Sequence, residues 1–117
     1  MPNRNNVTLS SLPPEGRGLV ALMQYMNFGR IEELKVLKGL PVLNPVPRLF
    51  REIKLGGENG PHAKGALGEF LVRAEVRELL GVLTQMGEGV ILLIEVRYGL
   101  PVKMVYEECG MPQLNYN

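Results

Sequence analysis

The chain has 117 residues, of which 45% are hydrophobic and 21% are charged, and its formal net charge is +1. These values are typical of one compact globular domain, and a charge this close to zero argues against a general attraction to nucleic acid or anionic lipid. The single cysteine, Cys109, excludes an intrachain disulfide, and the longest apolar run, residues 90–94, is too short to span a bilayer. Because the polar stretch MPNRNNVTLSSLPPEG also lacks the apolar core of a signal peptide, we expect a cytoplasmic protein.

After a predicted polar tail at residues 1–12, the first expected element is a helix. Its apolar side chains recur at the spacing of one buried helix face, at Leu19, Leu22, Met23 and Met26. Gly29 is expected to end this helix, and a strand over residues 30–37 follows. A tight hairpin turn at Lys38 and Gly39, which needs a positive φ, leads into a return strand from Leu40, so that residues 13–44 form one unit.

The connecting segment, residues 45–65, begins with prolines that break the return strand, Pro45 and Pro47. The stretch RLFREIKL that follows alternates weakly between polar and apolar residues, which predicts a fifth, edge-like strand. Glycine and proline in GGENGP, residues 56–61, predict a loop.

The second unit, residues 66–107, repeats the pattern of the first and precedes a polar tail at residues 108–117. We expect a longer helix over residues 66–86, a strand over residues 90–97, a turn at Tyr98 and Gly99, and a return strand from Leu100. When the chain is aligned with itself at an offset of 60, residues 19–42 and 79–102 share nine identities in 24 positions, including GLPV twice. Tandem duplication is the favoured explanation, and coincidence is the alternative.

The predicted fold class is α+β. Two αββ units would form a four-stranded antiparallel sheet, or a five-stranded one with the edge strand, and both helices would pack on one face around a pseudo-twofold axis. The strand VILLIEV, residues 90–96, is apolar on both faces and therefore needs cover on both sides. We expect a homodimer interface there, at Leu92, Ile94, Val96 and Tyr98, unless the connecting segment or a tail covers the strand.

Residue types that carry catalysis are scarce. The chain has no aspartate, and its only serines, Ser10 and Ser11, lie in the predicted tail. His62 and Cys109 could form a dyad on paper, but the two glutamates that precede the cysteine would disfavour its thiolate. One cysteine and one histidine are too few for a zinc site. We therefore expect no enzymatic activity, no cofactor and no metal.

Cations gather in the connecting segment, where exposed backbone N–H groups of a glycine-rich turn could help to bind an anion. The candidate anion or partner site consists of Arg48, Arg51, Lys54, His62 and Lys64. The spacing fits neither a P-loop nor a dinucleotide fingerprint. A solvated loop with scattered charges is the alternative.

The stretches FGRIEELKVLKGLPV, residues 28–42, and EGVILLIEVRYGLPV, residues 88–102, resemble the short bacterial YezD-like proteins, which are single αββ units of unknown function. That resemblance implies a bacterial αββ protein and carries no functional residue. The order helix-strand-strand twice is also that of LAGLIDADG homing endonucleases, whose helices end in an acidic residue. The corresponding places here lie near Met26 and Met86, and the chain has no aspartate, so the metal-binding carboxylates are missing. We therefore exclude nuclease activity and keep a non-cleaving DNA-binding sheet as an analogy of fold.

The sequence thus predicts a non-catalytic binding or assembly module that associates with itself through the sheet, or with a protein partner. The alternative is a nucleic-acid-binding protein whose phosphate contacts would be Arg48, Arg51, Lys54, Lys64, Arg97 and Lys103. A third hypothesis is an anion or small-molecule binder that uses the loop at residues 48–64.

Overall fold

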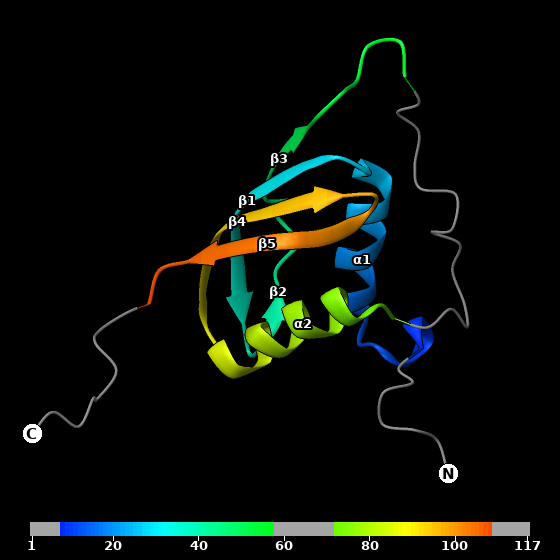
Figure 1. The fold of residues 1–117 in the computed structure, drawn as a ribbon. Helices are drawn as coiled ribbons and strands as arrows, with labels where there is room; N and C mark the ends of the chain where they lie inside the picture. The colour runs from blue at the N-terminus through cyan, green and yellow to red at the C-terminus, as the bar shows by residue number, and fades with distance from the viewer. Residues whose placement is uncertain (1–7, 58–71, 109–117) are drawn as a thin grey trace, which may run out of the picture.

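A computed structural model of the chain describes residues 8–57 and 72–108. It contains two helices and an antiparallel sheet, which confirms the predicted α+β class (Figure 1). In chain order the elements are η1 (Leu9–Ser11), α1 (Pro14–Met26), β1 (Gly29–Leu37), β2 (Leu40–Pro41), β3 (Arg48–Arg51), α2 (Ala74–Met86), β4 (Gly89–Arg97) and β5 (Leu100–Tyr106).

The sheet has the strand order β2-β1-β4-β5, and β3 pairs with the other end of β1 from the same side as β2. The central pair, β1 and β4, is antiparallel, with Ile31 opposite Ile94 and Leu34 opposite Ile91. The predicted edge-like strand in RLFREIKL therefore exists, but only its first four residues, Arg48–Arg51, belong to it.

Both predicted hairpin turns are confirmed by their backbone angles. Lys38 and Gly39 have φ values of 55° and 76°, and Tyr98 and Gly99 have values of 53° and 73°. Two successive positive φ values identify type I′ turns, whose twist suits antiparallel strands. Each turn donates a hydrogen bond to the end of the other half's helix, from Gly39 N to Gly87 O at 2.7 Å and from Gly99 N to Asn27 O at 3.0 Å. The two halves are thereby joined at both ends of the sheet.

The bounds of the two halves correspond. Both helices have 13 residues and both long strands have nine, and each pair starts 60 positions apart, as in the self-alignment of the sequence. Both units therefore adopt the same order of elements, whereas the tandem duplication stays a hypothesis about the history of the chain.

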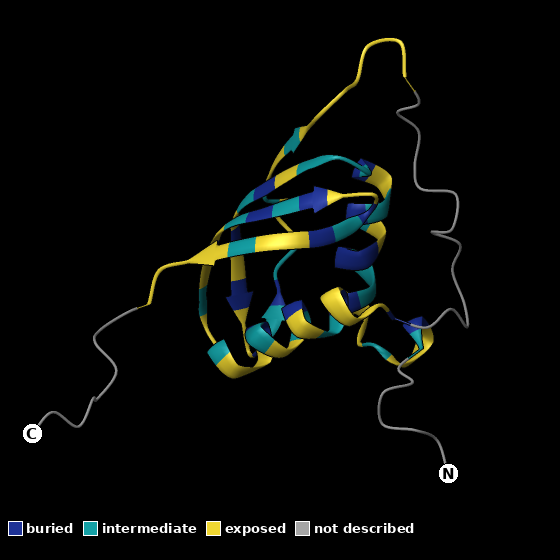
Figure 2. Ribbon diagram, viewed as in Figure 1, coloured by how far each residue is buried: buried dark blue, intermediate teal, exposed yellow. Residues whose placement is uncertain are grey.

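Both helices pack on one face of the sheet, where the core lies (Figures 1 and 2). The helices contribute Leu19, Met23, Met26, Val76, Leu79 and Leu83, and the two central strands contribute Ile31, Leu34, Val36, Ile91, Ile94 and Val96. Full burial of each aliphatic side chain is worth about 1.5–3 kcal/mol relative to exposure, so this shared layer is the main source of stability.

The spacing of the inward-facing residues shows that strict alternation fails in both central strands. Ile91 and Ile94 are both fully buried although they lie three residues apart, and so are Ile31 and Leu34. In β1 the additional residue, Glu33, has a positive φ of 58°, and in β4 the pairing with β5 shifts between Ile91 and Leu93. Such bulges reverse the face that later residues occupy.

This reversal corrects part of the predicted dimer interface. Ile94 and Val96 are 0% and 1% exposed and belong to the core beneath the helices, so they cannot contact a second chain. Leu92 and Tyr98, the other two predicted interface residues, are 44% and 66% exposed.

Three further boundaries differ from the sequence-based expectations. Helix α2 begins at Ala74 rather than at residue 66, because its N-cap, Arg73, has an extended backbone. The helices end at caps with positive φ, Asn27 and Gly87, and Gly29 starts the following strand instead of ending the helix. The polar tail is also shorter than expected, because Leu9 is 5% exposed and belongs to the core.

The strands β2 and β5 differ in length, and the residues that face them on the helices also differ. In the first half an added Cβ on Gly18 would lie 2.9 Å from Leu43 Cδ1, so the missing side chain leaves room for Leu43 to pack on α1 after β2 ends. The corresponding positions in the second half are Glu78 and Lys103. There the chain stays in the sheet, and β5 continues to Tyr106.

Candidate functional site

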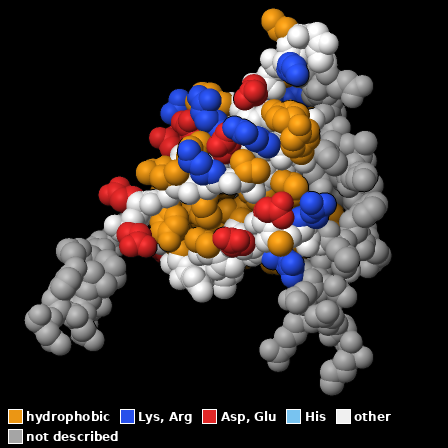
Figure 3. Space-filling model, viewed as in Figure 1, with side chains coloured by type: hydrophobic (Ala, Val, Ile, Leu, Met, Phe, Trp, Pro, Cys, Tyr) orange, Lys and Arg blue, Asp and Glu red, His pale blue; other side chains and the backbone are white. Residues whose placement is uncertain are grey.

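The candidate site is the face of the sheet opposite the helices, which we call the open face. Because both helices cover the same side, no described element covers the other one. From β3 to β5, the open face carries Arg48, Phe50, Arg30, Glu32, Lys35, Val90, Leu92, Leu93, Glu95, Arg97, Lys103 and Val105. Figure 3 shows lysine and arginine side chains gathered over these strands with glutamates between them.

The strand register places these side chains in rows of mixed charge. One row runs Phe50, Arg30, Glu95 and Lys103, and the next runs Arg48, Glu32, Leu93 and Val105. An ion pair joins the two rows, because Arg30 Nε lies 2.7 Å from Glu32 Oε2. A second ion pair links Glu95 of the first row to Arg97 further along β4, with Arg97 Nη2 2.8 Å from Glu95 Oε1. Since these pairs are exposed, each contributes at most about 1 kcal/mol to stability.

Phe50 lies under two guanidinium groups at the edge of the open face. The guanidinium carbon of Arg30 is 4.3 Å from the ring centroid, and that of Arg48 is 5.1 Å away. Contacts of this kind contribute about 0.5–1 kcal/mol each where they are exposed. They place both arginines beside the ring, which is half-buried.

An exposed apolar patch lies next to the charged rows. It consists of Val90, Leu92, Leu93 and Val105, and three of them, Val90, Leu92 and Val105, are 41%, 44% and 40% exposed. Leu93 lies opposite Val105 in the register of β4 and β5. Leu93 and Val105 are therefore direct neighbours, Leu92 precedes Leu93 in β4, and the charged side chains of the open face border this part of the sheet.

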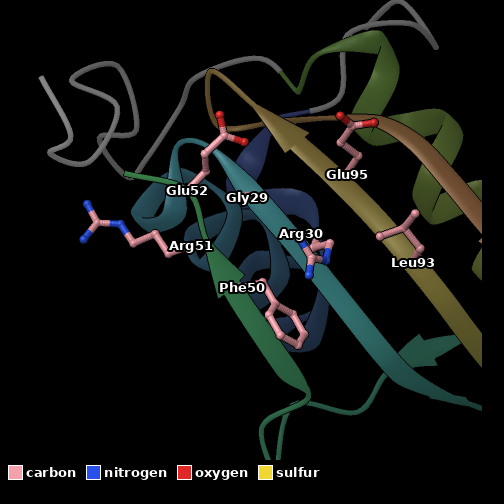
Figure 4. A pocket seen from close by; sticks show the side chains of 7 residues that line it. All are labelled: Gly29, Arg30, Phe50, Arg51, Glu52, Leu93 and Glu95. Carbon is pink, nitrogen blue, oxygen red and sulfur yellow. The ribbon is translucent and has the colours of Figure 1, made fainter. Parts of the chain in front are cut away.

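A shallow hollow of about 410 Å³ lies where β3, β1 and β4 meet, as Figure 4 shows. Its lining comprises Gly29, Arg30, Phe50, Arg51, Glu52, Leu93 and Glu95. Figure 4 also shows that the Arg51 side chain points away from Arg30 and Phe50. The hollow thus combines charges of both signs with one aromatic ring, and it offers no converging set of cations for an anion.

The predicted anion site is divided by the geometry of β3. Arg48 pairs with Glu32 on the open face, whereas Arg51 pairs with Gly29 and lies 5.4 Å from the Tyr25 ring of α1. A separation of three residues along a strand places the two arginines on opposite faces. Lys54 lies in the turn after β3, where its carbonyl accepts a hydrogen bond from Gly57 N at 2.9 Å. His62 and Lys64 lie outside the described residues.

Of the predicted interface, Leu92 belongs to the apolar patch, and Tyr98 lies in the second hairpin turn, edge-on to Phe28 at 4.8 Å between ring centroids. Sequence reasoning did not single out Arg30, Phe50, Leu93 or Val105. The alternation in RLFR could have placed Arg48 and Phe50 on one face. The face of Leu93 could not be predicted from alternation, because the bulge in β4 shifts the register there.

Within residues 8–57 and 72–108 there is no group of three or more histidine, cysteine or acidic side chains that could hold a metal ion. None of the helices described is both long and apolar enough to cross a membrane. Comparisons of the chain with family models, with curated proteins and with solved structures found no match.

Proposed function

We propose that the protein is a non-catalytic binding module that associates with a second copy of itself through the open face. The observation that carries this proposal is the apolar patch of Val90, Leu92, Leu93 and Val105 on a sheet face with no cover among the described residues. Contiguous exposed apolar surface on a small protein is a mark of an interface.

The charges around the patch support a second copy as the occupant. The open face carries both signs, with Arg30, Lys35 and Arg48 next to Glu32, and Arg97 and Lys103 next to Glu95. A surface of mixed charge can be complementary to itself across a twofold axis, whereas a face of one sign would repel its copy.

The size of the open face indicates a weak dimer. Four strands spaced about 4.8 Å apart and about seven residues long, at roughly 3.3 Å per residue, outline an area of about 440 Å² in projection. Stable complexes bury about 800 Å² on each partner. We therefore expect dissociation in the micromolar range, so that the oligomeric state depends on concentration.

Sedimentation velocity over a concentration series tests this proposal. The substitution Leu92→Glu places a carboxylate in the patch and should abolish the dimer, because the charge would be buried without a partner. Leu55→Glu is the matched control, since Leu55 is 91% exposed and lies outside the open face. A wild-type protein that stays monomeric at high micromolar concentration, or equal dimerisation by both variants, would overturn the proposal.

Nucleic-acid binding is the second candidate function, and five cations on the open face favour it: Arg30, Lys35, Arg48, Arg97 and Lys103. Glu32 and Glu95 weaken the field of three of these cations. A gel shift with generic DNA and RNA at about 50 mM salt, where phosphate contacts are strong, decides the matter. Retardation that disappears with added salt and in Arg48→Glu would favour this function, and no retardation would exclude it.

A further inference from the structure

A second surface, distinct from the open face, lies in the groove between α2 and β5. It has a volume of about 280 Å³ and is lined by Glu75, Glu78, Leu79, Pro101, Val102, Lys103 and Met104. Leu79 and Pro101 form a buried apolar floor, and Val102 at the rim is 51% exposed. Figure 3 shows hydrophobic side chains between β5 and α2 with acidic side chains beside them.

The first half of the chain shows what such a groove can accommodate. There the corresponding place between α1 and β2 is occupied by Leu43, which packs at Gly18 and against the core. In the second half Lys103 stands at the position of Leu43, and the groove is hollow. An aliphatic side chain from outside the chain would restore the contact that the first half makes with its own leucine.

The edge of β5 provides a second means of recognition. Among the described strands, β5 pairs only with β4, so its other edge is unpaired. Pro101 and the bulge next to it make the start of the strand unsuitable for pairing, but residues 103–105 follow a regular register. An extended peptide can add to such an edge through main-chain hydrogen bonds, while its alternate side chains enter the neighbouring groove.

The charge of the rim indicates which charge a bound peptide should carry. Glu75 and Glu78 line the groove and are exposed on α2. None of the ion pairs found among the described residues involves these carboxylates. The one cation among the lining residues is Lys103, and the strand register turns its side chain to the open face, opposite Glu95. The rim is therefore negative overall and complementary to lysine or arginine side chains.

We propose that the groove between α2 and β5 binds an extended peptide in which lysine or arginine stands two residues before and after an aliphatic side chain, so that all three point to the same face. The aliphatic side chain packs on Leu79 and Pro101, and the basic side chains face Glu75 and Glu78. The peptide backbone pairs with residues 103–105 of β5.

The test uses the full-length protein and a fluorescein-labelled nine-residue peptide with leucine at position 5, lysine at positions 3 and 7 and threonine elsewhere. The control is an otherwise equal peptide with glutamate at positions 3 and 7. We expect fluorescence anisotropy to show about tenfold tighter binding of the lysine peptide. The double variant Glu75→Lys/Glu78→Lys should lose about tenfold in affinity, whereas Glu52→Lys/Glu88→Lys, with the same change of charge on exposed sites outside the groove, should lose less than about twofold.

Amide shifts in the ¹⁵N spectrum on addition of the lysine peptide locate the binding site. Shifts confined to residues 75–79 and 101–106 support the proposal. The absence of shifts in residues 75–79, or equal loss of affinity in both double variants, would overturn it. A dimer that dissociates in Glu75→Lys/Glu78→Lys would also overturn it, because the groove would then hold a second copy. Leu92→Glu should not change peptide affinity, so this test is independent of the proposed dimer.

Discussion

Gly29 is the position at which the contact of β3 with β1 is most sensitive to a single methyl group. Its φ is +153°, and an added Cβ would press against the Phe50 carbonyl oxygen and lie 3.0 Å from Arg51 Cα. Both are backbone atoms of β3, so they cannot move aside like the end of a flexible side chain. We expect Gly29→Ala to displace β3 from β1.

The magnitude follows from what that displacement removes. The hydrogen bond from Glu52 N to Phe28 O, 2.9 Å long, would be lost at about 1 kcal/mol. A backbone conformation that side chains rarely adopt adds about 1–3 kcal/mol of strain. The free energy of unfolding should therefore fall by about 2–4 kcal/mol, which corresponds to a decrease in Tm of roughly 10–20 °C in a domain of this size.

Urea unfolding of Gly29→Ala and Gly89→Ala, followed by circular dichroism, measures the difference. Gly89 occupies the corresponding place at the start of β4, but an added Cβ there meets the flexible side chain of Met86, with Sδ at 3.0 Å. Gly89→Ala should therefore cost less than about 1 kcal/mol. Equal destabilisation by the two substitutions would refute the close approach of β3 to Gly29.

Two further substitutions test the composition of the core. Leu34→Ala should lower the free energy of unfolding by about 2–5 kcal/mol, because Leu34 is fully buried, whereas Leu37→Ala in the same strand should cost under about 0.5 kcal/mol, because Leu37 is 51% exposed; similar values in urea unfolding would contradict the assigned faces of β1. Leu9→Ala should lower the free energy of unfolding by about 2–3 kcal/mol in the same assay, because Leu9 belongs to the core. An unchanged urea midpoint would show that Leu9 does not pack on the core.

The hairpins were the most predictable part of the fold, because their requirement is local. A turn with two positive φ values favours glycine at its second position, and Gly39 and Gly99 meet this requirement. The helical spacing of Leu19, Met23 and Met26 likewise identified the buried face of α1. The start of α2 could not be predicted in this way, because residues 66–73 contain good helix formers and Arg73 is not a typical N-cap.

The faces of β4 were not predictable, because they depend on the pairing of three strands. Strict alternation would place Leu92, Ile94 and Val96 on one face, but the shift in register between Ile91 and Leu93 separates Leu92 from the other two. Two members of the candidate anion site are separated for a related reason. Arg48 and Arg51 were grouped because they are close in the sequence. Both lie in β3, three residues apart, so their side chains point to opposite faces of the sheet.

Self-association through the open face is tested most directly by ¹⁵N spectra of the wild-type protein over a dilution series from millimolar to low micromolar concentration. The proposed dimer should produce concentration-dependent amide shifts centred on Val90, Leu92, Leu93 and Val105, which Leu92→Glu abolishes. Spectra that do not change with concentration, or shifts that occur only outside the open face, would contradict the role assigned to this surface.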